Sequence, residues 1–164
     1  VEVAIFVRVQ SVADSFCDKT HFVKMHARGR CKEITFYVMD LVWASLRDVV
    51  EEVCKNVTRF PSTKIQIARQ TLKSIEALHE LGYIHRDIKP ANFAVGLPPN
   101  DNVIYLLEFG IAKTYRESAG AHRIARESVA FMGTVRYASA SALKRQEQSR
   151  RDDLEAWLYM MIQV

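Results

Sequence analysis

A run of eight residues between two short apolar segments constrains the fold of this chain more than any other feature. Short apolar segments at residues 83–84 and 103–107 bracket the run and are expected to form strands, so we expect a polar loop held at both ends. Its histidine, carboxylate, cations and amide form a combination that rarely arises by accident in eight positions. The residues are His85-Arg86-Asp87-Ile88-Lys89-Pro90-Ala91-Asn92.

A long helix is expected directly before this loop. Thr63 is the expected N-cap, because Gln66 three residues later completes a capping box. Gly82 lies where a C-terminal cap is expected. The apolar residues between these ends recur at helical spacing: Ile65, Ala68, Leu72, Ile75 and Leu78.

Two earlier segments are expected to be strands. They cover residues 21–30 and 34–41 and are joined by a turn at 29–33. The second segment is rich in β-branched and aromatic residues, as a buried strand should be. Residues 111–132 show no apolar period, so we expect a long loop there.

The last residues of the sequence, 152–164, predict a second helix that is apolar nearly all round. A helix of this kind is usually buried on most of its surface. We therefore expect it to lie inside a domain larger than this chain. The residues assigned to its buried side are Leu154, Trp157, Leu158, Met161 and Ile162.

Composition argues against several classes of function. The three cysteines form no CxxC pair, which disfavours a disulfide framework or zinc site and favours an intracellular location, cytoplasmic or nuclear. No apolar run approaches the length of a membrane span. The net charge is +4, but no basic stripe interleaved with aromatic residues indicates nucleic-acid binding. The first residue is Val1, so we expect the sequence to be an excerpt.

The eight-residue run matches the catalytic loop of protein kinases, H-R-D-x-K-x-x-N. In that chemistry Asp87 would accept or orient the proton of the attacking hydroxyl group. Lys89 would neutralise the moving phosphoryl group, and Asn92 would hold a metal ion through its amide oxygen.

A second motif, Glu108-Phe109-Gly110, follows Asp87 at a distance of 21 residues. This is the place of the kinase D-F-G motif, whose aspartate binds magnesium. Glu108 is one methylene longer than aspartate, and Mg²⁺ requires near-ideal octahedral geometry. A displacement of about 1 Å can cost on the order of a hundredfold in rate. We therefore expect a modified metal site at Glu108.

Two further stretches make the resemblance more specific: Gly133-Thr134-Val135-Arg136-Tyr137-Ala138-Ser139 and Ser149-Arg150-Arg151-Asp152-Asp153-Leu154-Glu155. Together with the continuation of the catalytic loop through Gly96, they resemble the casein kinase one group, nearest to its tau-tubulin kinase branch and related nematode-type kinases. The resemblance implies an α+β, eukaryotic protein-kinase-like fold that is truncated. Residues 1–42 would be the small-lobe remainder and hinge, and residues 43–164 an incomplete large lobe ending at its central helix.

The resemblance also implies a nucleotide site. Met39 would be the gatekeeper, and the backbone of Asp40 and Val42 in the hinge would face the adenine. Ala94 would form the floor below the ring, and Leu107 would directly precede the metal-binding acid.

Three residues beyond the catalytic loop receive roles from the same resemblance. Thr134 would bond to the side chains of Asp87 and Lys89. Arg136 would belong to a pocket for a phosphate or acidic group of the substrate, although a solvated basic loop over 113–136 is the alternative. Asp153 would bond to the backbone of the catalytic loop.

Residues 1–10 allow two interpretations. Val3-Ala4-Ile5-Phe6 is superficially similar to the V-A-I-K strand of kinases, with Phe6 in place of the ATP lysine. The favoured interpretation is the regulatory helix, because too few residues separate Phe6 from the next strand. Glu2 would then be the acid that pairs with an upstream lysine.

The resemblance as a whole implies a monomeric serine/threonine kinase that uses ATP with Mg²⁺ or Mn²⁺. Its substrates would be proteins with acidic or already phosphorylated sites, and neither a nucleic acid nor a membrane would be a partner. The alternative is a pseudokinase that serves as a binding module. Glu108 favours this alternative, as does Trp43, which stands where the family usually has a glycine after the hinge.

Overall fold

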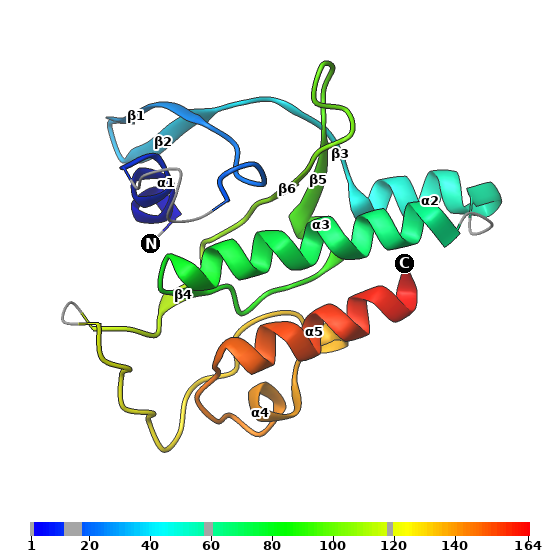
Figure 1. Ribbon diagram of the computed structural model, residues 1–164. Coiled ribbons are helices and arrows are strands. Elements are labelled where there is room, and N and C mark those ends of the chain that lie inside the picture. The colour runs from blue at the N-terminus through cyan, green and yellow to red at the C-terminus, as the bar shows by residue number, and fades with distance from the viewer. Residues whose placement is uncertain (1, 12–17, 58–60, 118–119) are drawn as a thin grey trace.

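The computed structural model describes residues 2–11, 18–57, 61–117 and 120–164. Helix α1 and a two-stranded sheet lie above a larger part dominated by helices (Figure 1). The upper part contains α1 (Glu2–Ser11), β1 (Met25–Cys31) and β2 (Ile34–Met39). The α+β, kinase-like fold class expected from the sequence is confirmed.

The lower part is built on two long helices and a second small sheet. Its sheet has the strand order β3-β5-β6, and β4 pairs with β7 separately. The strands are β3 (Val42–Ser45), β4 (Tyr83–Ile84), β5 (Phe93–Gly96), β6 (Ile104–Leu106) and β7 (Lys113–Thr114). The helices are α2 (Leu46–Val57), α3 (Pro61–Glu80), α4 (Ala140–Leu143) and α5 (Arg150–Gln163), with short 3₁₀ turns at Pro90–Asn92 and Val135–Tyr137.

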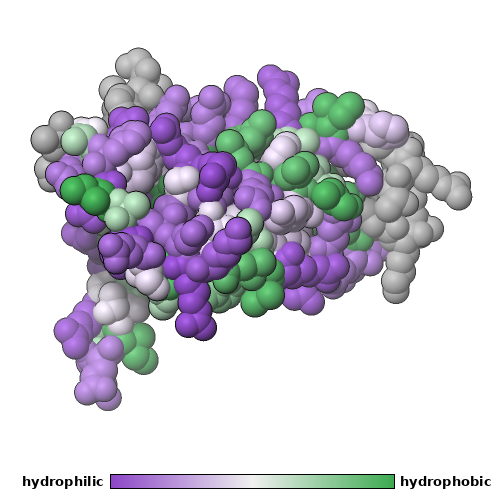
Figure 2. Space-filling view, turned by 90° about the horizontal axis from the view of Figure 1, so that it is seen from below, coloured by the Kyte–Doolittle hydropathy of each residue, from purple (hydrophilic) through white to green (hydrophobic). Residues whose placement is uncertain are grey.

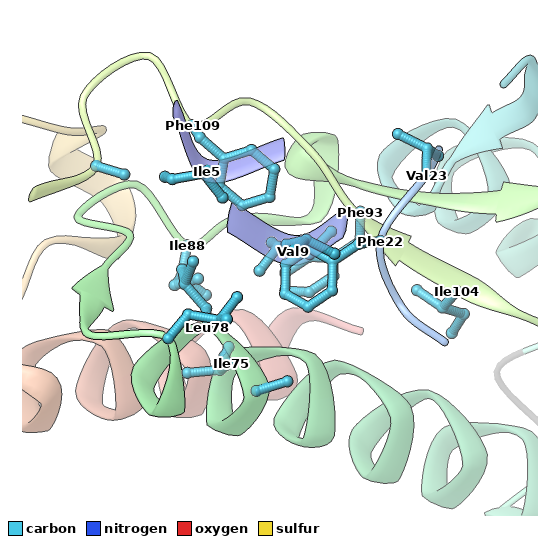
Figure 3. Close-up of a cluster of buried hydrophobic side chains, with 14 of the residues drawn as sticks. Ile5, Val9, Phe22, Val23, Ile75, Leu78, Ile88, Phe93, Ile104 and Phe109 are labelled. Carbon is cyan, nitrogen blue, oxygen red and sulfur yellow. The ribbon is translucent and has the colours of Figure 1, made fainter. Parts of the chain in front are cut away.

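The first residues form a helix, so the strand interpretation of Val3 to Phe6 is wrong. Ile5, Phe6 and Val9 lie on one side of α1 and are buried. This spacing fits a helix that packs one face on the core. Figure 3 shows Ile5 and Val9 among the side chains that fill the space above α3.

The strands β1 and β2 form the expected antiparallel hairpin, with Arg28 opposite Tyr37. However, β1 begins at Met25 rather than at residue 21. His21 is used elsewhere, because its carbonyl oxygen accepts a hydrogen bond from the Leu106 amide at 2.9 Å. Its ring Nδ1 also lies 2.8 Å from the Ile104 carbonyl oxygen. The strand β2 ends at Met39, two residues earlier than predicted.

Helix α3 begins at Pro61, so the prediction that Thr63 is the N-cap is wrong. Proline suits the first turn of a helix because its φ is already helical and because an N–H group at that position would have no partner within the helix. This start moves Thr63 into the helix. The other end is as expected, because Gly82 adopts a φ of +90° directly after the last turn.

Helix α5 exposes residues that were predicted to be buried. Leu154, Leu158 and Ile162 are 42%, 53% and 77% exposed, respectively. The helix instead buries Asp153, Ala156 and Met160. Because apolar residues occur all round the helix, their spacing does not identify the buried face. Apolar and hydrophilic patches alternate on the face of the molecule seen from below in Figure 2.

One apolar cluster joins the upper and lower parts. Phe109 is fully buried, and its ring centre lies 5.5 Å from that of Phe6 and 6.0 Å from that of Phe22. Ile88 and Leu78 approach this cluster from the catalytic loop and α3 (Figure 3). Core packing therefore fixes α1, the catalytic loop and the Glu108 motif relative to one another. None of the described helices is both long and apolar enough to cross a bilayer.

Candidate active site

Three side chains meet at Asp87: Lys89 and Asn92 come from the same loop, and Thr134 comes from a distant part of the sequence. Lys89 Nζ lies 2.7 Å from Asp87 Oδ2. The Thr134 hydroxyl donates to Asp87 Oδ1 at 2.7 Å and accepts from Lys89 Nζ at 3.0 Å. The contacts that were expected for Thr134 are therefore present, and they close a triangle around the carboxylate.

Asn92 completes this group from the end of the catalytic loop. Its Nδ2 donates to the Asp87 carbonyl oxygen at 2.7 Å and to Asp87 Oδ2 at 3.1 Å. Both bonds use the amide nitrogen, so the amide oxygen is the atom that can face a metal ion. Asn92 is buried, and the 3₁₀ turn Pro90–Asn92 sets its position.

Opposing effects act on the ionisation of Asp87. Burial raises the pKa of its carboxyl group, but hydrogen bonds from Lys89, Thr134 and Asn92 outweigh burial and hold the pKa below its usual value. Asp87 is therefore an anion at neutral pH. A carboxylate that is already paired with a cation is a weak base, but it can orient a hydroxyl group. It accepts the hydroxyl proton only when the oxygen forms its new bond and the proton becomes acidic.

The catalytic-loop backbone is held by Asp153, as expected. Its two carboxylate oxygens accept hydrogen bonds from the backbone amides of His85 and Arg86, each at 2.8 Å. His79 Nε2 lies 2.8 Å from Asp153 Oδ2 and connects the end of α3 to the same carboxylate. Arg86 has a φ of +70°, a conformation that costs energy for a side chain with a Cβ. Asp153 therefore stabilises a strained turn.

His85 links the catalytic loop to the Glu108 motif. Its Nε2 lies 3.0 Å from the Leu107 carbonyl oxygen, and its Nδ1 accepts from the Asp87 amide at 3.2 Å. Burial lowers the pKa of His85, so its ring is neutral. A neutral ring with a proton on Nε2 fits both contacts.

Glu108 is exposed, and its backbone is fixed on both sides. The Leu107 amide donates to the Asn92 carbonyl oxygen at 2.9 Å. On the other side, the Phe109 amide donates to Glu2 Oε1 at 3.2 Å. Glu108 itself has a φ of +63°. The structure thus places Glu2 against the backbone of the Glu108 motif, a contact that the sequence did not indicate.

The donor types of two predicted ligands, Asn92 and Glu108, suit a magnesium or manganese ion. Asn92 and Glu108 offer an amide oxygen and a carboxylate, which hard cations prefer. Among the described residues, no group of three or more His, Cys, Asp or Glu side chains is placed to hold a metal ion. Two protein ligands are compatible with Mg²⁺, which usually takes its other ligands from water and substrate phosphates.

The residues expected to line the nucleotide site lie at the end of β2, at the start of β3 and in β5. Met39 is partly buried against the core and Ala94 is buried in β5. Val42 starts β3 opposite Gly96. The Asp40 carboxylate binds His26 Nε2 at 2.7 Å and the Lys24 amide at 2.8 Å, and the Asp40 amide donates to the Lys24 carbonyl oxygen at 3.0 Å. These bonds attach the hinge to the start of β1, and its contact with adenine stays a prediction.

Arg136 lies directly beyond Thr134 in the 3₁₀ turn Val135–Tyr137. Its guanidinium is exposed and lies 6.0 Å from the centre of the Tyr137 ring. Two other cations of the basic segment, which we define as residues 113–136, bind Glu147 instead: Lys113 at 2.8 Å and Arg126 at 2.6 Å. The sequence did not indicate this use of Glu147, because no local pattern connects residues so far apart.

Comparison with known families agrees with this geometry. The model of the protein kinase domain matches residues 15–162. The chain belongs to the protein kinase domain family. The match includes the catalytic loop, the Glu108 motif and Asp153.

Curated relatives from two organisms are named as serine/threonine-protein kinases. A protein of Dictyostelium discoideum with the name "Probable serine/threonine-protein kinase" is 38% identical over 136 residues, which is 82% of this chain and 27% of that protein. Serine/threonine-protein kinase spe-6 of Caenorhabditis elegans is 35% identical over 143 residues, covering 87% and 38%. A second C. elegans relative, whose name places it in the same class, is 37% identical over 154 residues, covering 94% and 46%. The chain thus spans less than half the length of these relatives.

Proposed function

We propose that this protein is a serine/threonine kinase of the casein kinase one group, nearest to the tau-tubulin kinase branch. It transfers the γ-phosphoryl group of ATP to serine or threonine hydroxyls of protein substrates. The observation that carries this proposal is the triangle of Asp87, Lys89 and Thr134, with Asn92 bonded to the same carboxylate. A polar loop without catalytic purpose has no reason to concentrate these groups around one anion.

The side chains divide the reaction between them. Asp87 orients the substrate hydroxyl and takes its proton as the oxygen–phosphorus bond forms. Lys89 neutralises charge on the phosphoryl group, and Thr134 holds Lys89 and Asp87 at a fixed separation. Bound Mg²⁺ or Mn²⁺ supplies neutralisation of the phosphate oxygens, with Asn92 and Glu108 as its protein ligands.

The adenine contacts belong to the same proposal. Met39 is the gatekeeper, and backbone groups of Asp40 and Val42 bind the adenine edge. Ala94 and Leu107 lie below the ring. Glu2 completes the site by pairing with a lysine upstream, an interaction that is compatible with its bond to the Phe109 amide, because a carboxylate has two oxygens.

Substrate choice rests on Arg136. Its exposed guanidinium lies two residues from Thr134 and can receive a phosphate or an acidic side chain of the substrate. Lys113 and Arg126 both pair with the single carboxylate of Glu147, so we assign the substrate contact to Arg136, the cation of the basic segment closest to Thr134 in the sequence. A monomer inside the cell, where ATP and protein substrates occur together, is part of the proposal.

Glu108 favours a second candidate function. A longer side chain at the metal site can leave the fold intact and remove turnover, which would make the protein a pseudokinase that binds partners. The exposed position of Glu108 allows its carboxylate to turn away from a metal ion that Asn92 would hold. The two functions predict different responses to shortening this side chain.

Phosphate transfer from labelled ATP to casein tests the proposal, with Mg²⁺ and with Mn²⁺. The variant Asp87→Asn is the inactive control, and Glu108→Asp restores the usual acid. We expect the wild-type protein to label casein well above the Asp87→Asn background, and Glu108→Asp to raise the Mg²⁺-dependent rate by about tenfold or more. A wild type equal to Asp87→Asn, together with an active Glu108→Asp, would establish the pseudokinase instead. Inactivity of all three proteins on casein and on acidic peptides would refute the kinase proposal.

A further inference from the structure

Glu147 lies outside the catalytic group and forms ion pairs with two cations that are distant in the sequence. Its carboxylate is only 11% exposed and bridges two cations. Lys113 Nζ lies 2.8 Å from Oε1, and Arg126 Nε lies 2.6 Å from Oε2. Arg126 Nη2 adds a longer bond at 3.4 Å. A carboxylate held from both sides in this way has a defined position.

The environment keeps Glu147 ionised. The hydrogen bond from Arg126 is the largest influence, burial opposes it, and Lys113 adds to it, so the pKa of Glu147 falls to about 2. The carboxylate is therefore charged throughout the physiological pH range. An uncharged glutamine of the same shape would lose most of this attraction.

A third cation brings the catalytic loop into the same cluster. Arg86 is half-buried and donates from Nε to the Ile111 carbonyl oxygen at 2.7 Å. Burial lowers the pKa of Arg86, and attraction to Glu147 is the largest effect that opposes this shift. Glu147 therefore pairs with two cations of the basic segment, Lys113 in β7 and Arg126, and attracts Arg86 of the catalytic loop.

Backbone contacts connect the residues next to Glu147 with the basic segment, which leads to the catalytic group. The Val129 amide donates to the Arg145 carbonyl oxygen at 2.9 Å. Gly133 follows with a φ of +108°, and a Cβ at this position would stand 2.5 Å from the Arg86 carbonyl oxygen. The basic segment thus passes tightly over the catalytic loop, and its next residue is Thr134, which bonds to Asp87.

We propose that Glu147 is a positioning residue for phosphoryl transfer: its fixed carboxylate holds the basic segment in the place that brings Thr134 to Asp87. In many kinases a phosphate added to the corresponding segment does this by pairing with arginines. Here a carboxylate built into the sequence takes the place of that phosphate, so the segment is ordered without modification. The expected effect of Glu147 on the reaction rate rests on the proposed kinase function. Its expected effect on the order of the basic segment does not.

Charge and geometry at residue 147 can be varied separately in the full-length protein. Glu147→Gln removes the charge, Glu147→Asp keeps the charge on a shorter arm, and Glu127→Gln is the control in an exposed residue of the same segment. We expect Glu147→Gln to lower kcat about tenfold while the KM for ATP stays within twofold, and Glu147→Asp to recover part of the loss. Amide hydrogen exchange should become faster over residues 120–134 in Glu147→Gln and stay unchanged in Glu127→Gln.

Two results would overturn the inference. One is Glu147→Gln with unchanged exchange over residues 120–134. The other is wild-type protein that loses its activity after phosphatase treatment, since a phosphate would then be ordering the segment. If the wild type has no kinase activity, the exchange comparison still decides the role of Glu147, and only the proposed function fails. Arg126→Gln changes the exposed partner of the pair and should show the same exchange effect if Glu147→Gln does not fold.

Discussion

Asp153 offers a direct test of how the catalytic loop is held. Its carboxylate is 1% exposed and accepts three contacts at 2.8 Å, from the His85 amide, the Arg86 amide and His79 Nε2. Replacement by alanine leaves two backbone N–H groups buried without partners, and each such group costs about 1–3 kcal/mol. We therefore expect Asp153→Ala to lower the free energy of unfolding by about 2–6 kcal/mol, a large share of the 5–15 kcal/mol typical of a domain.

Asparagine at the same position separates the individual bonds. It keeps one oxygen acceptor but presents an NH₂ group to a second donor, so one bond is lost and one remains. The expected cost of Asp153→Asn is about 1–3 kcal/mol, roughly half of that for alanine. The order of stability should be wild type, then asparagine, then alanine.

Urea unfolding of the full-length proteins, followed by circular dichroism, measures these differences. Glu76→Gln, an exposed acid on α3, is the control and should match the wild type within about 0.5 kcal/mol. Asp153→Ala within that same margin would refute the reasoning, because the buried amides would then have found other partners. An asparagine variant less stable than the alanine variant would also contradict it.

Thr134 and Glu147 give two further predictions. Thr134→Ala removes the hydroxyl that joins Asp87 to Lys89 and should lower kcat about tenfold, whereas Thr134→Ser should retain most of the wild-type kcat. Steady-state kinetics with casein measures both values. An equal loss of kcat in both variants would contradict the role of the hydroxyl. The pKa of Glu147 is lowered from 4.5 to about 2, so its ion pairs stabilise the fold fully above pH 4.5 and lose their effect as the pH falls through 2. The shift corresponds to roughly 3 kcal/mol at most, and less because Arg126 is 58% exposed and screened. The stability gap between wild type and Glu147→Gln in urea should therefore shrink by more than half from pH 6 to pH 3. A constant gap would refute the assignment.

The sequence predicted the centre of the site better than its surroundings. Asp87, Lys89 and Asn92 lie within six residues, so their proximity follows from a short loop. The contacts of Thr134 and Asp153 with that loop came from family resemblance, because no local pattern connects residues 45 or more positions apart. Such contacts depend on how helices and loops pack, which spacing along the chain does not encode.

Errors in the predicted elements have local causes. Both Pro61 and Thr63 are acceptable at a helix start, and the capping box favoured the wrong one. No helix was predicted over Leu46–Val57, although Ser45 and Asp48 form a capping pair at its start: the Asp48 amide donates to Ser45 Oγ at 3.2 Å. Ser45 and Asp48 have the same three-residue spacing as the capping box proposed for Thr63 and Gln66. Together with the apolar Leu46, which is buried, this pair indicates the start of the helix.

Glu108 differs from the aspartate usual at this position by one methylene group, and the residues next to it in the sequence have defined contacts. The residues on both sides of Glu108 are fixed, Leu107 by its bond to Asn92 and Phe109 by complete burial and its bond to Glu2. These contacts restrain the backbone from moving to compensate for a longer side chain. The carboxylate can reach the position of an aspartate only by folding back through its own χ angles, and the exposed surroundings leave room for this. In the proposed mechanism, turnover therefore depends on the rotamer of the Glu108 side chain rather than on the fold, and we expect Glu108→Asp to change the metal site with little effect on the rest of the protein.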